Sequence, residues 1–218
     1  MKKYLLVLIF SALCATLAVA GPREQLLDSA NIIKEMARSS DMIPSTVLTK
    51  ARAVVVFPDA KKIGFFLGGE FGHGVAVIKK SDGSWGNPFF VTLESGSLGW
   101  QFGFEMNSIL LIFNTQSSAN SLLENSMTMG ADASISAGPL SQSFEKNSKI
   151  DLSAEIFSYR KAKGLFIGLS LKGAVIRHDS SQDVEYYGNG MKASDIVMMP
   201  IKEDSFAIRE FRAALNLL

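Results

Sequence analysis

The sequence has few of the side chains from which enzymes build metal centres and nucleophilic sites. Its 218 residues include one cysteine, Cys14, and two histidines, His73 and His178. It contains no H-x-x-x-H or H-E-x-x-H spacing and no G-x-S-x-G nucleophile elbow. Because a metal centre needs several converging ligands and a nucleophile needs a base beside it, the sequence predicts no metal site, no catalytic residues and no cofactor.

The first 20 residues have the pattern of an export signal. Lys2 and Lys3 give a positive start, an apolar stretch follows from Tyr4, and Ala18-Val19-Ala20 forms an A-x-A cleavage site before Gly21. The apolar stretch is shorter than the roughly 20 residues that span a bilayer, which favours a cleaved signal over a membrane anchor. We therefore expect residues 1–20 to be a signal peptide and residues 21–218 to form a single domain.

Cleavage would leave the mature chain without cysteine, and hence without disulfides. Lipidation of Cys14 is an alternative that Leu13 disfavours, because a small residue is needed there. Export without disulfides is typical of a bacterial periplasm or of an outer-membrane or cell-surface protein. Without Lys2 and Lys3 the 22 basic residues become 20, against 21 acidic ones. This nearly neutral balance argues against nucleic acid as a partner.

Glycine is concentrated in one part of the chain. Ten of the 18 glycines lie between positions 64 and 103, interleaved with aromatic residues. Gly69, Gly72 and Gly74 follow neither phosphate-binding glycine motif, and a strand rather than a helix comes after them. Glycines among large rings are typical of bends in a curved sheet, so we interpret Lys61 to Gly74 as a bent sheet segment.

Apolar periodicity predicts an α+β fold. Residues at three- and four-residue steps predict amphipathic helices over 22–38 and 205–218, with shorter helices over 44–51 and 117–125. Asp82-Gly83 predicts a hairpin turn, and Pro58 is expected to end the first strand. Continuous or alternating apolar residues predict strands over 53–57, 75–78, 109–113, 131–137, 150–156 and 165–171. We expect a curved, barrel-like antiparallel sheet with amphipathic helices at the N- and C-terminal ends.

Basic residues occur in local groups beside the predicted strands. If they converge, they would form a patch for anionic head groups, and each would contribute about 1 kcal/mol near an anionic surface. Alternatively, each group only makes its loop soluble. The helix over 23–38 has two interpretations as well, insertion into a membrane interface or packing on its own domain. The candidate lipid-binding residues are Lys61, Lys62, Lys79, Lys80, Arg160, Lys161 and Lys163.

Several ordered blocks of sequence resemble the SYLF domain family over roughly residues 30–196. The blocks are IPSTVLTKARAVVVFPDAKKIGFFLGGEFGHGVAVIKKSDGSWGNPFF, GSLGWQFGFE, ILLIFNT, MGADASISAGPL and FSYRKAKGLFIGLSLKGAVI. That family includes exported bacterial proteins and lipid-binding, actin-associated modules of eukaryotic endocytic proteins. The resemblance implies phospholipid binding through basic residues and an amphipathic N-terminal helix, here the helix over 23–38 with Lys61 and Lys62.

The export signal distinguishes this chain from the eukaryotic members, whose ligands are phosphoinositides. We therefore expect an exported, non-enzymatic protein that binds anionic phospholipid surfaces of a bacterial envelope. The alternative is a structural or protein-interaction module with an envelope protein as its partner. The sequence predicts no particular lipid and no oligomeric state.

Overall fold

The computed structural model describes residues 20–39, 43–65, 67–98, 103–141, 152–162, 164–188, 190–201 and 205–218. The helices are α2 (Pro22–Arg38), α3 (Ser45–Leu48), α4 (Gln116–Ser121), α6 (Ser180–Tyr187), α7 (Ala193–Met198) and α8 (Phe206–Leu215). The strands are β1 (Ala53–Phe65), β2 (Leu67–Ile78), β3 (Phe89–Leu98), β4 (Gly103–Phe113), β5 (Ser126–Thr128), β6 (Ile135–Ala137), β7 (Ile156–Ala162), β8 (Leu165–Gly168) and β9 (Val175–His178).

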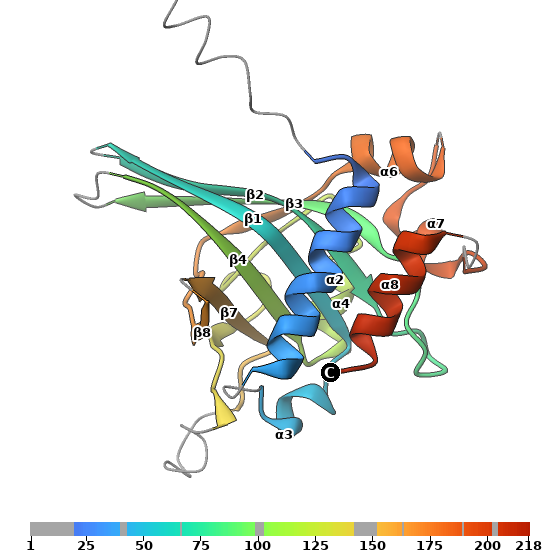
Figure 1. The fold of residues 1–218 in the computed structure, drawn as a ribbon, viewed down its shortest axis with the longest axis horizontal. Helices are drawn as coiled ribbons and strands as arrows, with labels where there is room; N and C mark the ends of the chain where they lie inside the picture. The colour runs from blue at the N-terminus through green and yellow to red at the C-terminus, as the bar shows by residue number, and fades with distance from the viewer. Residues whose placement is uncertain are drawn as a thin grey trace, which may run out of the picture.

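The strands form one curled sheet in the order β5-β9-β3-β2-β1-β4-β7-β6, with β8 paired to β7 (Figure 1). Neighbouring strands run antiparallel except β6 and β7, which are parallel. The fold is thus α+β with a curved, barrel-like sheet and helices at both ends, as the sequence predicts. The single parallel pair makes the sheet mixed.

The strand β1 is buried on both faces of the sheet. Val54 and Val56 pack in a cluster with α2 and α8, and we call this side of the sheet the α2 face. Val55 and Phe57 pack on the opposite side with residues of α4 and α7, and we call this side the α4 face. Because successive residues of a strand point to opposite faces, burial on both sides explains why the sequence is apolar at every position from Ala53 to Phe57.

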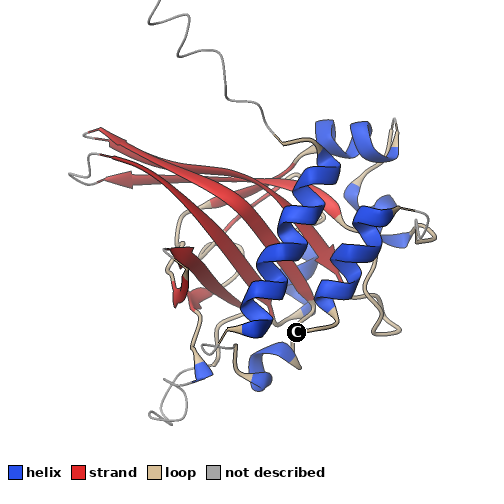
Figure 2. Ribbon diagram, viewed as in Figure 1, coloured by secondary structure: helices blue, strands red, loops and turns tan. Residues whose placement is uncertain are grey.

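The helix α2 covers the sheet with its apolar side. Pro22 occupies the first turn, where its missing N–H group costs nothing, and the helix ends at Arg38. Leu26, Ile33 and Met36 are at most 1% exposed, and α2 packs along α8 on the same face of the sheet (Figure 2). Burial of one such side chain stabilises the fold by about 2 kcal/mol. The predicted helix over 22–38 is confirmed, and its apolar side belongs to the domain core.

Pro58 does not end β1, so that prediction is wrong. The register of β1 shifts between Phe57 and Ala60 against β4, and between Val56 and Lys61 against β2. Pro58 and Asp59 fall in this bulge, where a residue without an N–H group loses no ladder hydrogen bond. The strand continues beyond the bulge to Phe65.

Beyond the bulge, the ends of β1, β2, β3 and β4 extend past α2 and α8 (Figure 2). Two glycines on β2 are required where this extension begins. A Cβ on Gly74 would lie 2.4 Å from Cδ1 of Phe57, and a Cβ on Gly72 would lie 3.2 Å from Cα of Ala60. The interpretation of 61–74 as a bent sheet segment is thus confirmed for its described residues.

The alternating stretches in the second half form shorter strands than the sequence predicts. Only 135–137 of the stretch 131–137 is a strand, because Ala131 and Asp132 form a turn in which the Asp132 carboxylate accepts the Thr128 N–H. β7 begins at Ile156, residues 152–155 lie outside any strand, and positions 150 and 151 lie outside the described residues. β8 ends at Gly168. Alternation in polar sequence is therefore typical of turns as well as strands.

The predicted hairpin turn and short helices are present. Gly83 has φ +83°, and Asp82 Oδ1 accepts hydrogen bonds from the backbone N–H and the hydroxyl of Ser84 at 2.8 and 2.6 Å. The predictions over 44–51, 117–125 and 205–218 correspond to α3, α4 and α8. Within the described part of the chain, no helix combines the length and the apolar character needed to cross a membrane.

Candidate functional site

The predicted basic residues do not gather in one patch. Lys61 and Lys62 lie on the extended part of β1, where Lys61 is opposite Phe71 of β2. Lys79 and Lys80 follow Ile78, which is opposite Ala53 at the start of β1. At the usual rise of a strand, these two pairs are about 25 Å apart along the sheet. The two pairs are therefore too far apart to form one patch.

Arg160 and Lys161 of β7 are bound by carboxylates of the protein itself. Arg160 Nη2 donates to both carboxylate oxygens of Glu70 at 2.6 and 2.8 Å, on the α4 face. The side chains of Arg160 and Glu70 are only 12% and 8% exposed, and burial raises the pKa of Glu70 although Arg160 and Lys62 act to lower it. Lys161 forms an ion pair with Glu35 of α2. Lys163 lies outside the described residues.

Lys61 and Lys62 have acidic neighbours. Lys62 lies opposite Glu70 on β2 and opposite Glu105 on β4. Lys61 lines a groove of about 1040 Å³ on the α2 face, together with Asp59 and residues of α2 and β2. Sequence reasoning missed these carboxylates because strand pairing, not chain order, brings them beside the lysines.

Basic residues also collect at the start of β1, where Asp82 is an acidic neighbour of Lys80. We call Lys50, Arg52, Lys79 and Lys80 the basic end. Lys79 Nζ lies 4.7 Å from the ring centroid of Trp85, and the Lys79 N–H donates to the Arg52 carbonyl at 2.7 Å. Burial, and then the charge of Arg52, lowers the pKa of Lys79. Lys50 and Arg52 are exposed. Sequence reasoning found Lys79 and Lys80 here and missed Lys50 and Arg52, because only the pairing of β1 with β2 brings the four together.

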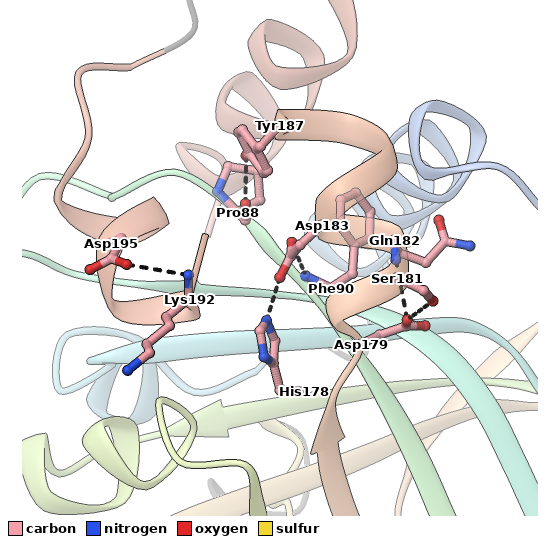
Figure 3. Close-up of polar contacts among 10 residues, drawn as sticks. All are labelled: Pro88, Phe90, His178, Asp179, Ser181, Gln182, Asp183, Tyr187, Lys192 and Asp195. Carbon is pink, nitrogen blue, oxygen red and sulfur yellow. Dashed lines mark hydrogen bonds and ion pairs between the residues drawn. The ribbon is translucent and has the colours of Figure 1, made fainter. Parts of the chain in front are cut away.

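Two acidic residues at the start of α6 connect that helix to the sheet (Figure 3). Asp183 is fully buried, pairs with Nε2 of His178 and accepts the Phe90 N–H at 3.1 Å. Burial raises the pKa of Asp183, against the opposing effect of these hydrogen bonds. The Asp179 carboxylate accepts from the Ser181 hydroxyl and the Gln182 N–H at 2.6 and 3.2 Å, which caps α6.

Asp179 also contacts Nδ1 of His73 on β2 at 3.0 Å. Although its burial acts to raise the pKa of Asp179, the hydrogen bonds from His73, Ser181 and Gln182 lower that pKa to about 2. The order Ser181, Asp179, His73 places the carboxylate between hydroxyl and imidazole, whereas a hydrolytic triad needs the histidine beside the nucleophile. These contacts hold α6 against the strands β2, β3 and β9, and they do not place a nucleophile beside a base.

A metal centre is likewise missing from the described residues, where no three His, Cys, Asp or Glu side chains converge. What the described surface offers is a basic end beside a tryptophan and an acidic groove at the opposite end of the sheet. Charged surfaces of this kind belong to the class of features on which proteins bind partners of opposite charge.

A family comparison agrees with this class. The family model described as "Las17-binding protein actin regulator", Ysc84, matches residues 94–217, which is more than half of the chain. The chain belongs to this family, and the SYLF resemblance is confirmed.

One of the relatives with curated names is a binding protein by that name. The chain is 31% identical to LAS seventeen-binding protein 3 of Saccharomyces cerevisiae over 80% of its own length and 40% of the relative's. It is 29% identical to Protein YSC84 of the same yeast over 75% and 36% of the two lengths. It is 27% identical to human SH3 domain-containing YSC84-like protein 1 over 72% and 46%. The chain thus spans less than half of each of these relatives.

Proposed function

We propose that the protein is an exported, non-enzymatic binding module that associates with anionic phospholipid surfaces of a bacterial envelope. The observation that carries the proposal is the basic end, where Lys79 lies over the Trp85 ring and beside Arg52. Basic side chains near an anionic surface contribute about 1 kcal/mol each, and tryptophan favours the boundary between head groups and acyl chains. Export rests on the A-x-A pattern before Gly21.

The structure favours the basic end over the other predicted residues. Arg160 and Lys161 are engaged by Glu70 and Glu35, and Lys61 shares its groove with carboxylates. The apolar side of α2 is packed on the sheet, so inserting this helix into a membrane would require unfolding part of the core. Attraction through an exposed basic surface needs no such change.

Co-sedimentation with phosphatidylglycerol vesicles tests the proposal. Reversing the charges of Arg52 and Lys80 together to Glu should weaken binding about tenfold or more, because four units of charge change at the surface. Lys61→Glu with Lys62→Glu makes the same charge change at the opposite end and should weaken binding less. Binding should also fall as salt rises, since exposed charges are screened.

Three outcomes would contradict the proposal. Equal binding to phosphatidylcholine vesicles would remove the electrostatic basis. A larger loss with the Lys61 and Lys62 variant would move the site to the extended end of β1. A mature protein whose first residue is not Gly21, as found by N-terminal sequencing, would contradict the proposed processing.

A protein-interaction module of the envelope is the second candidate. The names of the relatives favour it, since the family description specifies binding of Las17 and regulation of actin. Failure to bind vesicles, combined with capture of one envelope protein from the native compartment, would favour this alternative.

A further inference from the structure

A groove on the α2 face lies between the start of α2 and the extended strands. It has a volume of about 1040 Å³ and is lined by Glu24, Gln25 and Asp28 of α2, Asp59 and Lys61 of β1, and Phe71 of β2, among others. We call it the acidic groove. Figure 1 shows the start of α2 beside β2 and β3. It lies at the opposite end of the sheet from the basic end.

Carboxylates outnumber amines along this groove. Glu24, Asp28 and Asp59 take part in no ion pair with another described residue. Burial, and then the charges of Asp59 and Glu24, raises the pKa of Asp28. Glu24 also lies in the first turn of α2, where a negative charge stabilises the helix. That role accounts for Glu24 alone and does not extend to Asp28 and Asp59.

A second, independent feature is an amide oxygen with no partner. Gln25 is only 2% exposed, and its Oε1 atom accepts no hydrogen bond within the described structure. A buried acceptor without a donor costs free energy, and a bound donor would remove that cost. Gln25 lines the groove beside Asp28. Like the carboxylates, the unpartnered oxygen is a hydrogen-bond acceptor that requires an N–H donor.

The floor of the groove is bare backbone. Gly69 and Gly96 are paired across β2 and β3, and their position in the strands places them on the α2 face. A Cβ on Gly96 would meet nothing within 4 Å, and a Cβ on Gly69 would make only an ordinary contact at 3.6 Å. Neither packing nor a positive φ requires glycine here. Side chains at these two positions would instead occupy the groove.

We propose that the acidic groove binds a basic, extended segment of a partner protein. An arginine or lysine side chain lies between Gln25 and Asp28, and the segment crosses the floor formed by Gly69 and Gly96. Phe71, which is 43% exposed, contacts the apolar side chains that alternate with the basic ones. The carboxylates of the groove and the unpartnered oxygen are all hydrogen-bond acceptors. An arginine or lysine side chain supplies several N–H donors for them.

Fluorescence anisotropy with a labelled peptide of alternating arginine and leucine tests the proposal. The peptide should bind, more weakly as salt rises, and a matched peptide of glutamate and leucine should not. Asp28→Asn with Asp59→Asn should weaken binding about tenfold. The matched control, Glu105→Gln with Glu124→Gln, removes two charges outside the groove and should change binding less than about twofold.

Three further variants distinguish a site from a structural role. Gly96→Trp fills the groove and should abolish binding while the melting temperature stays unchanged. Gln25→Met removes the unpartnered oxygen at similar volume, so it should weaken binding without lowering the melting temperature. Lys61→Gln removes a repulsive charge and should strengthen binding about threefold, whereas loss of a lysine weakens binding to anionic vesicles.

Unchanged binding in Gly96→Trp would overturn the assignment of the groove. Equally tight binding of spermidine, competing with the peptide, would replace the peptide segment by a small cation. Because the proposed membrane surface is at the basic end, failure of either proposal leaves the other intact.

Discussion

On the two sides of the bulge at Pro58, the central strands are built from different residues and buried differently. Before the bulge, residues 53–57 of β1 and their partners 75–78 of β2 are at most 3% exposed, and both faces of the sheet are covered. After it, Phe71 is 43% exposed and Met106 is 57% exposed. The first part forms the core, and the second provides surface.

Glycine occurs in both parts for different reasons. Gly74 lies at the boundary, where its missing side chain leaves room for the ring of Phe57. Gly96 lies on the extended part, where a side chain would meet open space. A glycine in a strand therefore indicates close packing in one place and an accessible backbone in another. Substitutions at the two positions should therefore differ in sign.

Gly74→Ala should have the largest effect on stability. The new Cβ would lie 2.4 Å from Cδ1 of Phe57 and 2.5 Å from the Val56 carbonyl oxygen, so a fully buried ring and a strand would have to move. Overpacking of this kind costs about 3 kcal/mol. Urea unfolding followed by circular dichroism measures the loss. A change below about 1 kcal/mol would show that this boundary is not tightly packed.

Arg160→Met should have the next largest effect, because Arg160 connects the extended part of β2 to β7. Its loss leaves Glu70 buried without its cation, which costs about 2 kcal/mol at neutral pH. Burial already raises the pKa of Glu70 in the folded state, and without Arg160 that pKa rises further. Protonated Glu70 therefore contributes to the free energy of unfolding. This contribution is fully present below the pKa of Glu70 in the unfolded chain, and it is lost as pH rises through the pKa in the folded state.

The Arg160→Met variant should therefore recover much of its deficit when urea unfolding is repeated near pH 5. Glu70→Leu with Arg160→Met removes both charges and should be more stable than Arg160→Met alone at neutral pH. Lys34→Met is the matched control, because it breaks the more exposed pair with Glu210 and should cost less than about 1 kcal/mol. A pH-independent deficit in Arg160→Met would mean that lost packing, not charge, dominates.

The core was predictable from sequence and the edges were not. An apolar residue at every position of 53–57 indicates a strand with two buried faces, and three- and four-residue spacing indicates α2. Pro58 was misinterpreted because a bulge depends on partner strands that a local pattern does not contain. β9 has only four residues, which is too short for a periodic signal. Local patterns specify local structure, and register comes from pairing.

The same limit applies to the candidate sites. Paired lysines are visible in the sequence, but whether a lysine stands free depends on its neighbours across the sheet. Lys62 lies between Glu70 and Glu105, whereas Lys79 lies beside Arg52. The unpartnered oxygen of Gln25 has no sequence signal either, because a glutamine on an amphipathic helix is ordinarily solvated.

Gly96→Ala should have the smallest effect, and of opposite sign to Gly74→Ala. The new Cβ would meet no atom within 4 Å, and replacing glycine by alanine at a compatible strand position restricts the unfolded chain. We expect the free energy of unfolding to rise by about 0.5 kcal/mol in the same urea experiment. A loss of about 1 kcal/mol or more would mean that the backbone at Gly96 needs glycine for its conformation, and the glycine floor would then reflect the strand itself rather than a ligand.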